Sequence, residues 1–219
     1  MLARSRRILL PLGAMVLVAG AASAQMTVRA VECRGMAGGM RINSAKVYLG
    51  TAIEKRRTDP TLFQSKLRSA LAQLDTALLQ GREDPMTVAF LLGQARILGG
   101  DLVGADSMFT RAEATGSDDC KRVMAQLRRS EWANYFNGGL TQSRAGNADS
   151  ALALFRRGSL IWRAEPAGFL EISNYFASRR QADSAIVYAL RAARSTDEPR
   201  FAENRKVAWF NAAQLLQGA

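Results

Sequence analysis

Apolar and small residues recur along most of this chain every three or four positions, which is the spacing of one face of an α-helix. Two such runs lie on either side of Gly99-Gly100, and the same arrangement follows around Gly146-Asn147 and around Arg180-Gln181. Few runs of Val, Ile and Thr reach the length of a strand. The pattern therefore predicts an all-α chain built from pairs of helices, each pair joined by a short turn.

The second helix of the last two pairs begins with the same four residues, Ala-Asp-Ser-Ala, at 148–151 and again at 182–185, 34 residues apart. Ala105 in the preceding pair fits the same frame. Each of these alanines has a small residue twelve positions before it and another seven positions after it, and in two pairs a phenylalanine follows four positions later. On a helix such positions share one stripe, where small residues let a neighbouring helix approach closely. The repeated positions are Gly93, Ala105, Phe109 and Ala112, then Gly139, Ala151, Phe155 and Gly158, then Ser173, Ala185 and Ala192.

A 34-residue helix–turn–helix unit with these positions resembles the tetratricopeptide repeat (TPR) family. The resemblance covers roughly residues 45–219 and implies a right-handed α-solenoid of TPR-like repeats. The chain departs from the family pattern where Ala105 and Ala151 are 46 residues apart, and where Ala189 replaces the aromatic residue. We expect the additional residues to lengthen one helix, which begins after a cap at Gly116-Ser117-Asp118.

The first 24 residues have the pattern of a secretory signal peptide. A basic start is followed by an apolar stretch from Ile8 to Gly20 and by Ala22-Ser23-Ala24, a small-residue cleavage site. Cleavage before Gln25 predicts an exported protein, periplasmic or secreted, with no membrane span left after cleavage. The expected organisation is a signal peptide at 1–24, a flexible segment at 25–44, repeat units at roughly 45–82, 86–118, 119–166 and 167–199, and a C-terminal helix at 200–217.

Composition narrows the function further. The formal net charge is +11, but the basic pairs are scattered along the chain, so no nucleic-acid partner is expected. The chain has no histidine and no P-loop, and its short acidic pairs lack the spacing of a calcium loop. We therefore predict no catalytic residues, no cofactor and no metal, which makes the chain a non-enzymatic protein.

The resemblance also implies where a partner would bind, because in TPR proteins the first helix of each unit lines a concave groove. A protein or peptide is the expected partner. The lysine/asparagine clamp of some family members is not matched, since Leu170 stands where the clamp has lysine, although Asn174 is present. The groove candidates, each of which could instead be packing residues, are Phe90, Gln94, Phe136, Leu140, Arg144, Leu170, Asn174 and Ser178.

Two further features leave alternatives open. The C-terminal helix is apolar almost all round, so it either folds back to cap the array, with Arg205, Lys206 and Gln214 outward, or binds a second copy or a partner. A structural, self-associating or envelope-attached protein with a basic surface is therefore the alternative function. The two cysteines either pair in the oxidising compartment or stay free. The candidate residues are Trp209, Phe210 and Leu216 for homodimerisation, and Cys33 and Cys120 for a disulfide.

Overall fold

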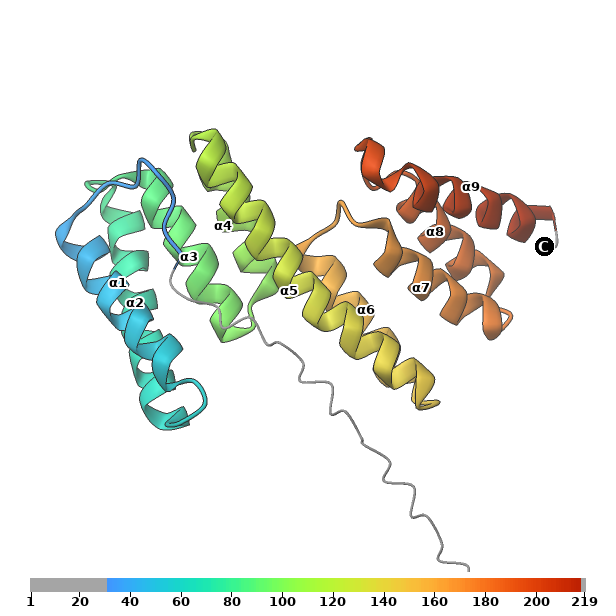
Figure 1. Ribbon diagram of the computed structural model, residues 1–219, viewed down its shortest axis with the longest axis horizontal. Coiled ribbons are helices and arrows are strands. Elements are labelled where there is room, and N and C mark those ends of the chain that lie inside the picture. Colours follow the sequence, from blue (N-terminus) through green and yellow to red (C-terminus); the bar gives the residue numbers. More distant parts are fainter. Residues whose placement is uncertain (1–30, 218–219) are drawn as a thin grey trace, which may run out of the picture.

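The computed structural model describes residues 31–217, and the regular secondary structure of this part of the chain is entirely helical (Figure 1). The predicted signal peptide lies outside the described residues. The predicted all-α class is confirmed. The helices are α1 (Met40–Lys55), α2 (Pro60–Gln80), α3 (Pro85–Gly99), α4 (Leu102–Glu113), α5 (Asp118–Arg144), α6 (Ala148–Ile161), α7 (Pro166–Ser178), α8 (Ala182–Ala193) and α9 (Ala202–Gln217), with a 3-10 turn at Pro199–Phe201 before α9.

Short polar caps set most of the helix starts. The side chains of Asp59, Asp84 and Asp101 each accept a hydrogen bond from a backbone N–H in the first turn of α2, α3 and α4. Proline occupies the first position of α2 and α3, where its missing N–H has no helical partner to lose. Ser117 caps α5 as the sequence predicted, by accepting from Cys120 N at 3.3 Å.

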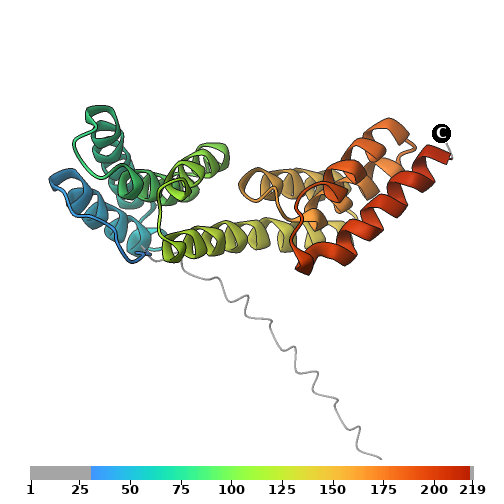
Figure 2. The ribbon, with the colours of Figure 1, turned by 90° about the horizontal axis from the view of Figure 1, so that it is seen from above.

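Consecutive helices pack as pairs, α1 with α2, α3 with α4, α5 with α6 and α7 with α8, and α9 packs on α8. Figures 1 and 2 show these pairs following one another along the long axis of the molecule. The 27 residues of α5 contain the additional length that the repeat spacing predicted, and this helix extends from the first two pairs to α6, its partner in the third pair.

The repeated small residues lie where helices of one pair meet. A Cβ atom on Gly93 would overlap the ring of Phe109, and one on Gly139 would overlap the ring of Phe155 in the same way. In the pair of α7 and α8 the ring is absent because residue 189 is alanine. Ser173 fits there, and its hydroxyl donates to Ala185 O at 2.8 Å. The missing aromatic at position 189 and the larger residue at position 173 therefore compensate for one another.

The turns between paired helices share a backbone conformation. Gly100 and Gly146 both have φ of 79°, in the left-handed region that glycine adopts without steric cost. Arg180 takes the equivalent place between α7 and α8 with φ of 59°, the only described residue other than glycine with positive φ. The turns at these three positions agree with the sequence prediction.

The largest part of the core surrounds α3, where twelve of fifteen residues are buried. This cluster extends over α1, α2, α4 and the first half of α5. Two smaller clusters follow, one between α6 and α7 and one between α8 and α9. The first half of the described chain therefore has a thick core, whereas the second half is held by smaller contacts.

The predicted flexible segment at 25–44 is wrong at its C-terminal end, because α1 begins at Met40 rather than at Ala45. The physical reason lies outside the segment. Glu83, in the turn before α3, accepts hydrogen bonds from Arg41 N at 2.8 Å and from Ile42 N at 2.9 Å. A carboxylate at the helix start satisfies free N–H groups there and stabilises the additional turn.

Candidate partner-binding surfaces

Residues 31–39 lie as a segment against α3, and two buried polar side chains of α3 hold its backbone. The Gln94 amide accepts from Val31 N at 3.1 Å and donates to Val31 O at 2.8 Å. Thr87 Oγ1 accepts from Ala37 N at 3.0 Å. Both side chains are almost fully buried, so their polar groups depend on these partners.

A disulfide between Cys33 and Cys120 ties the same segment to the start of α5. Two further contacts flank it, since Arg34 N donates to Asp119 at 2.9 Å and Ser117 donates to Arg34 O at 3.2 Å. The hydrogen bond from Arg34 N lowers the pKa of Asp119 below its ordinary value, with a smaller contribution from Arg122. The segment is therefore anchored by a disulfide and by several hydrogen bonds within a few residues.

This arrangement corrects the sequence prediction for Phe90 and Gln94. Phe90 is fully buried beside Phe109, and Gln94 is occupied by Val31, so neither side chain can line an open groove. The reason is that α3 is mostly apolar and is covered by its neighbours on almost every side. Sequence periodicity gave the helix but could not show that the N-terminal segment would cover it.

The other groove candidates fall into two groups. Phe136, Leu140 and Leu170 are half-buried and pack into the clusters of the second half, with the Phe136 ring stacked on Trp132 at 4.7 Å. Arg144, at the end of α5, and Asn174 and Ser178, on α7, are exposed. The solvent-facing candidates therefore all belong to the second half of the chain.

Charged side chains are also distributed unevenly between the two halves of the described chain. Residues 31–119 contain eleven basic and eleven acidic side chains, whereas residues 120–217 contain fifteen basic and eight acidic ones. The first half is electrically balanced and the second half has an excess of seven positive charges. Any charge-driven attraction of a partner acts on the second half.

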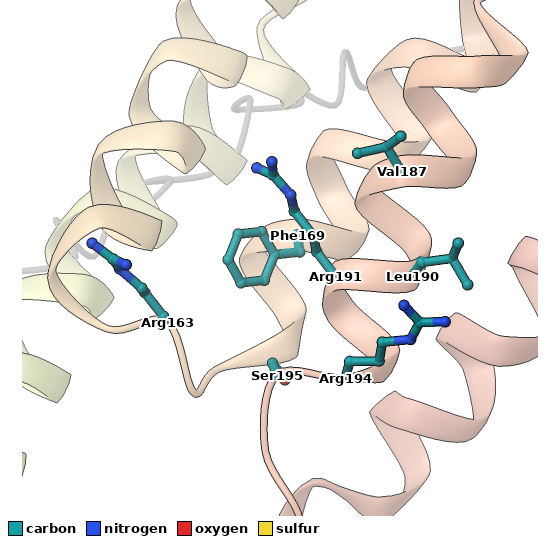
Figure 3. A pocket seen from close by; sticks show the side chains of 7 residues that line it. All are labelled: Arg163, Phe169, Val187, Leu190, Arg191, Arg194 and Ser195. Carbon is teal, nitrogen blue, oxygen red and sulfur yellow. The ribbon is translucent and has the colours of Figure 1, made fainter.

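One hollow with a volume of about 470 Å³ lies on this basic half, and we call it the arginine pocket. In Figure 3 the ring of Phe169, on α7, lies between Arg163, on the loop after α6, and Arg191, on α8. Arg194 lies below Leu190 in this view, and its guanidinium is 5.7 Å from the ring of Trp209 on α9. The lining residues are Arg163, Phe169, Val187, Leu190, Arg191, Arg194 and Ser195.

Aromatic rings and arginines continue from the arginine pocket along α7. Phe176, seven residues after Phe169, stacks on Tyr188 with ring centroids 5.6 Å apart. Arg156 lies over Phe176 at 5.6 Å and Arg191 over Tyr188 at 5.1 Å, so guanidinium groups cover both rings. Cation–π contact orders the arginines but leaves their N–H donors free for an anion.

Sequence reasoning missed this pocket. Arg163, Arg191 and Phe169 belong to three separate elements, and only packing of α7 against α8 brings them together. The one available signal was Arg191 followed by Arg194, three positions apart on one helix face. That spacing is common on solvated helices and does not by itself indicate a site.

Helix α9 packs on its neighbours through Ala208 and Ala212. The three self-association candidates are exposed, at 48% for Trp209, 62% for Phe210 and 60% for Leu216. Trp209 and Leu216 are seven residues apart and share a face, whereas Phe210 is turned by about 100° from Trp209. Of the side chains expected to face outward if α9 caps the array, Lys206 and Gln214 are exposed, whereas Arg205 is partly buried and donates to Thr196 O at 2.6 Å and to Asp197 at 2.7 Å.

Burial raises the pKa of two carboxyl groups of the second half above their ordinary values. They are Glu131 on α5 and Glu165 at the start of α7. Neither group has a metal-ligating or nucleophilic neighbour set, and residues 31–217 hold no cluster of three metal-binding side chains. Within the same residues, no helix has the length and apolar character to cross a membrane.

Comparison with known proteins adds no assignment. No protein-family model, no curated protein and no solved structure matches this chain.

Proposed function

We propose that this chain is an exported scaffold of TPR-like repeats, arranged as a right-handed α-solenoid, which binds a protein or peptide partner and catalyses no reaction. The observation that supports it most is the repeated contact of Gly93 with Phe109 and of Gly139 with Phe155. A close approach that recurs in successive helix pairs is what a repeat array requires. Such arrays mostly serve as extended binding surfaces.

The binding surface in this proposal is confined to the second half of the chain. The residues that hold an extended backbone in the first half, Gln94 and Thr87, are already bonded to residues 31–37. The exposed groove candidates Arg144, Asn174 and Ser178 lie on α5 and α7. The partner would therefore lie along α5 and α7, in the periplasm or outside the cell.

Site-specific cross-linking in the exporting cell tests the proposal. A photoreactive benzoylphenylalanine is placed at Asn174 on α7 and, as a matched control, at Gln64 on α2, which is equally solvent-facing. We expect a discrete cross-linked protein from position 174 and none from position 64. Equal cross-linking from both positions, or none from either, would contradict a partner-binding groove on α5 and α7.

The exposed aromatic residues of α9 favour the second candidate function, self-association. Trp209, Phe210 and Leu216 leave an apolar surface at the end of the array, where terminal repeats of soluble proteins usually carry a polar face. A protein that assembles through this surface would be a structural component rather than a partner-binding scaffold. Molecular mass in solution separates the two functions.

A further inference from the structure

We infer that the arginine pocket is a docking site for an acidic segment of a partner protein that inserts one apolar side chain. This inference rests on the proposed function, since it names the chemistry of the partner. It adds a binding point outside the groove candidates, on the face between α6 and α8.

The pocket exists because the stacking of helices is interrupted there. Helix α4 packs directly on α6. Helix α8, in contrast, packs on α7 and α9 and has little contact with α6. Apolar side chains that a continuous stack would cover therefore stay in solvent. Val187 on α8, which lines the pocket, is 47% exposed.

The floor of the pocket fits an apolar side chain. Phe169, Val187 and Leu190 line it, and Phe169 is half-buried below the arginines. The volume of about 470 Å³ leaves room for one leucine or phenylalanine side chain and adjoining backbone, in a hollow that is largely open to solvent.

The rim requires negative charge in the ligand. None of the described residues that line the pocket is acidic. Arg191 and Arg194 make no ion pair within residues 31–217, and Arg163 approaches a carboxylate, Asp106, only at 3.8 Å. Guanidinium groups bind carboxylates through two parallel hydrogen bonds, so aspartate or glutamate next to the inserted side chain would complete the site.

A protein segment fits this geometry better than an anionic membrane. Lipid-binding surfaces present apolar side chains that project beyond the basic ones into the bilayer. Here the largest apolar side chain of the pocket, Phe169, is half-buried, and its ring lies between Arg163 and Arg191 in Figure 3. The ligand must therefore reach inward, as an extended acidic segment with one apolar side chain can.

Fluorescence anisotropy with the full mature chain tests the inference. The probe is a fluorescein-labelled peptide with a central Leu-Phe flanked by glutamates and aspartates, and the comparison peptide replaces these acids with their amides. We expect the acidic peptide to bind and the amide peptide to bind at least about tenfold more weakly. Binding of the acidic peptide should also weaken as salt rises from 50 to 300 mM.

The variants distinguish binding in the arginine pocket from attraction by the net charge of the chain. Arg163→Gln with Arg191→Gln should weaken binding at least about tenfold, and Val187→Glu should do the same by placing a like charge in the pocket. Arg82→Gln with Arg111→Gln removes the same charge from exposed positions of the first half and should change binding less than about twofold. Circular dichroism checks that each variant retains its helix content.

Three results would overturn the inference. The first is that the acidic peptide does not bind. The second is that the two charge-matched double variants weaken peptide binding equally. The third is that phosphatidylglycerol vesicles bind and lose binding in the same variants, while the peptide does not bind. Discrete cross-linking from position 174 together with any of these would leave the proposed scaffold function in place and remove only the pocket.

Discussion

Arg128 shows how the basic pairs of the sequence divide into structural and exposed members. Its side chain is buried between α4 and α5, where it pairs with Asp106 at 3.0 Å and with Glu113, and donates to Thr110 at 3.2 Å. The guanidinium also lies 5.3 Å from the Phe109 ring, the ring that packs on Gly93. Its neighbour Arg129 is exposed. One arginine of the pair therefore holds two helices together, and the other contributes to surface charge.

We expect Arg128→Ala to lower the free energy of unfolding by about 3 kcal/mol, because two carboxylates lose their buried partner. Arg129→Ala, with the same change in charge, should cost about 0.5 kcal/mol or less. Urea denaturation of both variants makes the comparison. Equal losses would mean that the pairing between α4 and α5 does not contribute to stability.

The raised pKa of Glu131 makes the stability of the chain depend on pH in the opposite direction to that of a carboxylate in an ion pair. Burial raises its pKa in the folded chain above the unfolded value of about 4.3, so the folded state holds the proton more tightly. Stability from this group is complete below the unfolded pKa and falls as pH rises through the folded pKa. Glu131→Gln should therefore melt at a higher temperature than the parent at pH 7 and at the same temperature near pH 4. A difference that does not change with pH, or a less stable variant at pH 7, would refute this account.

At the scale of the helix pair, the glycines of this chain have opposite roles. Gly93 of α3 meets the Phe109 ring with no space for a methyl group. Gly50 of α1 is also helical, but nothing lies within 4 Å of where its Cβ would be. Only the first is required for packing, although the sequence pattern presents both as glycines inside helices.

We expect Gly93→Ala to destabilise the chain by about 1–3 kcal/mol through overpacking against Phe109. Gly50→Ala should instead stabilise it by about 0.5–1 kcal/mol, because alanine loses less backbone freedom on folding. Thermal melts followed by circular dichroism measure both. If Gly93→Ala were as stable as the parent, the close contact that defines the repeat would not exist.

The sequence predicts much of the element level, for reasons that are local. Helix spacing, the turns at Gly100, Gly146 and Arg180, and the cap at Ser117 all follow from residues within a few positions of each feature. What the sequence did not predict depends on distant residues. Glu83 capping α1 and Gln94 holding Val31 involve partners 41 to 63 positions apart, and no local pattern records them.

At the scale of the whole molecule, the N-terminal segment joins the first helix pairs to α5. The disulfide closes a separation of 87 residues, and the contacts of Gln94 and Thr87 extend along the same segment. A covalent closure over that length mainly restricts the unfolded chain. The segment and α5 together therefore connect the balanced first half to the basic second half.

Removing both cysteines should release this segment. We expect Cys33→Ala with Cys120→Ala to lower the free energy of unfolding by about 2–5 kcal/mol and to speed trypsin cleavage after Arg34, whose backbone is held beside the disulfide. Cleavage after Arg82, in the turn before α3, serves as the internal reference. Unchanged cleavage at Arg34, measured by mass spectrometry, would mean that the hydrogen bonds alone hold the segment.

The mass of the chain from residue 25 to 219, measured by light scattering across a dilution series, tests the central claim most directly. A partner-binding scaffold predicts the mass of one chain at every concentration, with α9 held on its own array through Ala208 and Ala212. The opposite result is a dimer that dissociates when Trp209 and Phe210 are changed to serine. That result would make the end of the array an interface between copies and would contradict the scaffold in favour of self-assembly.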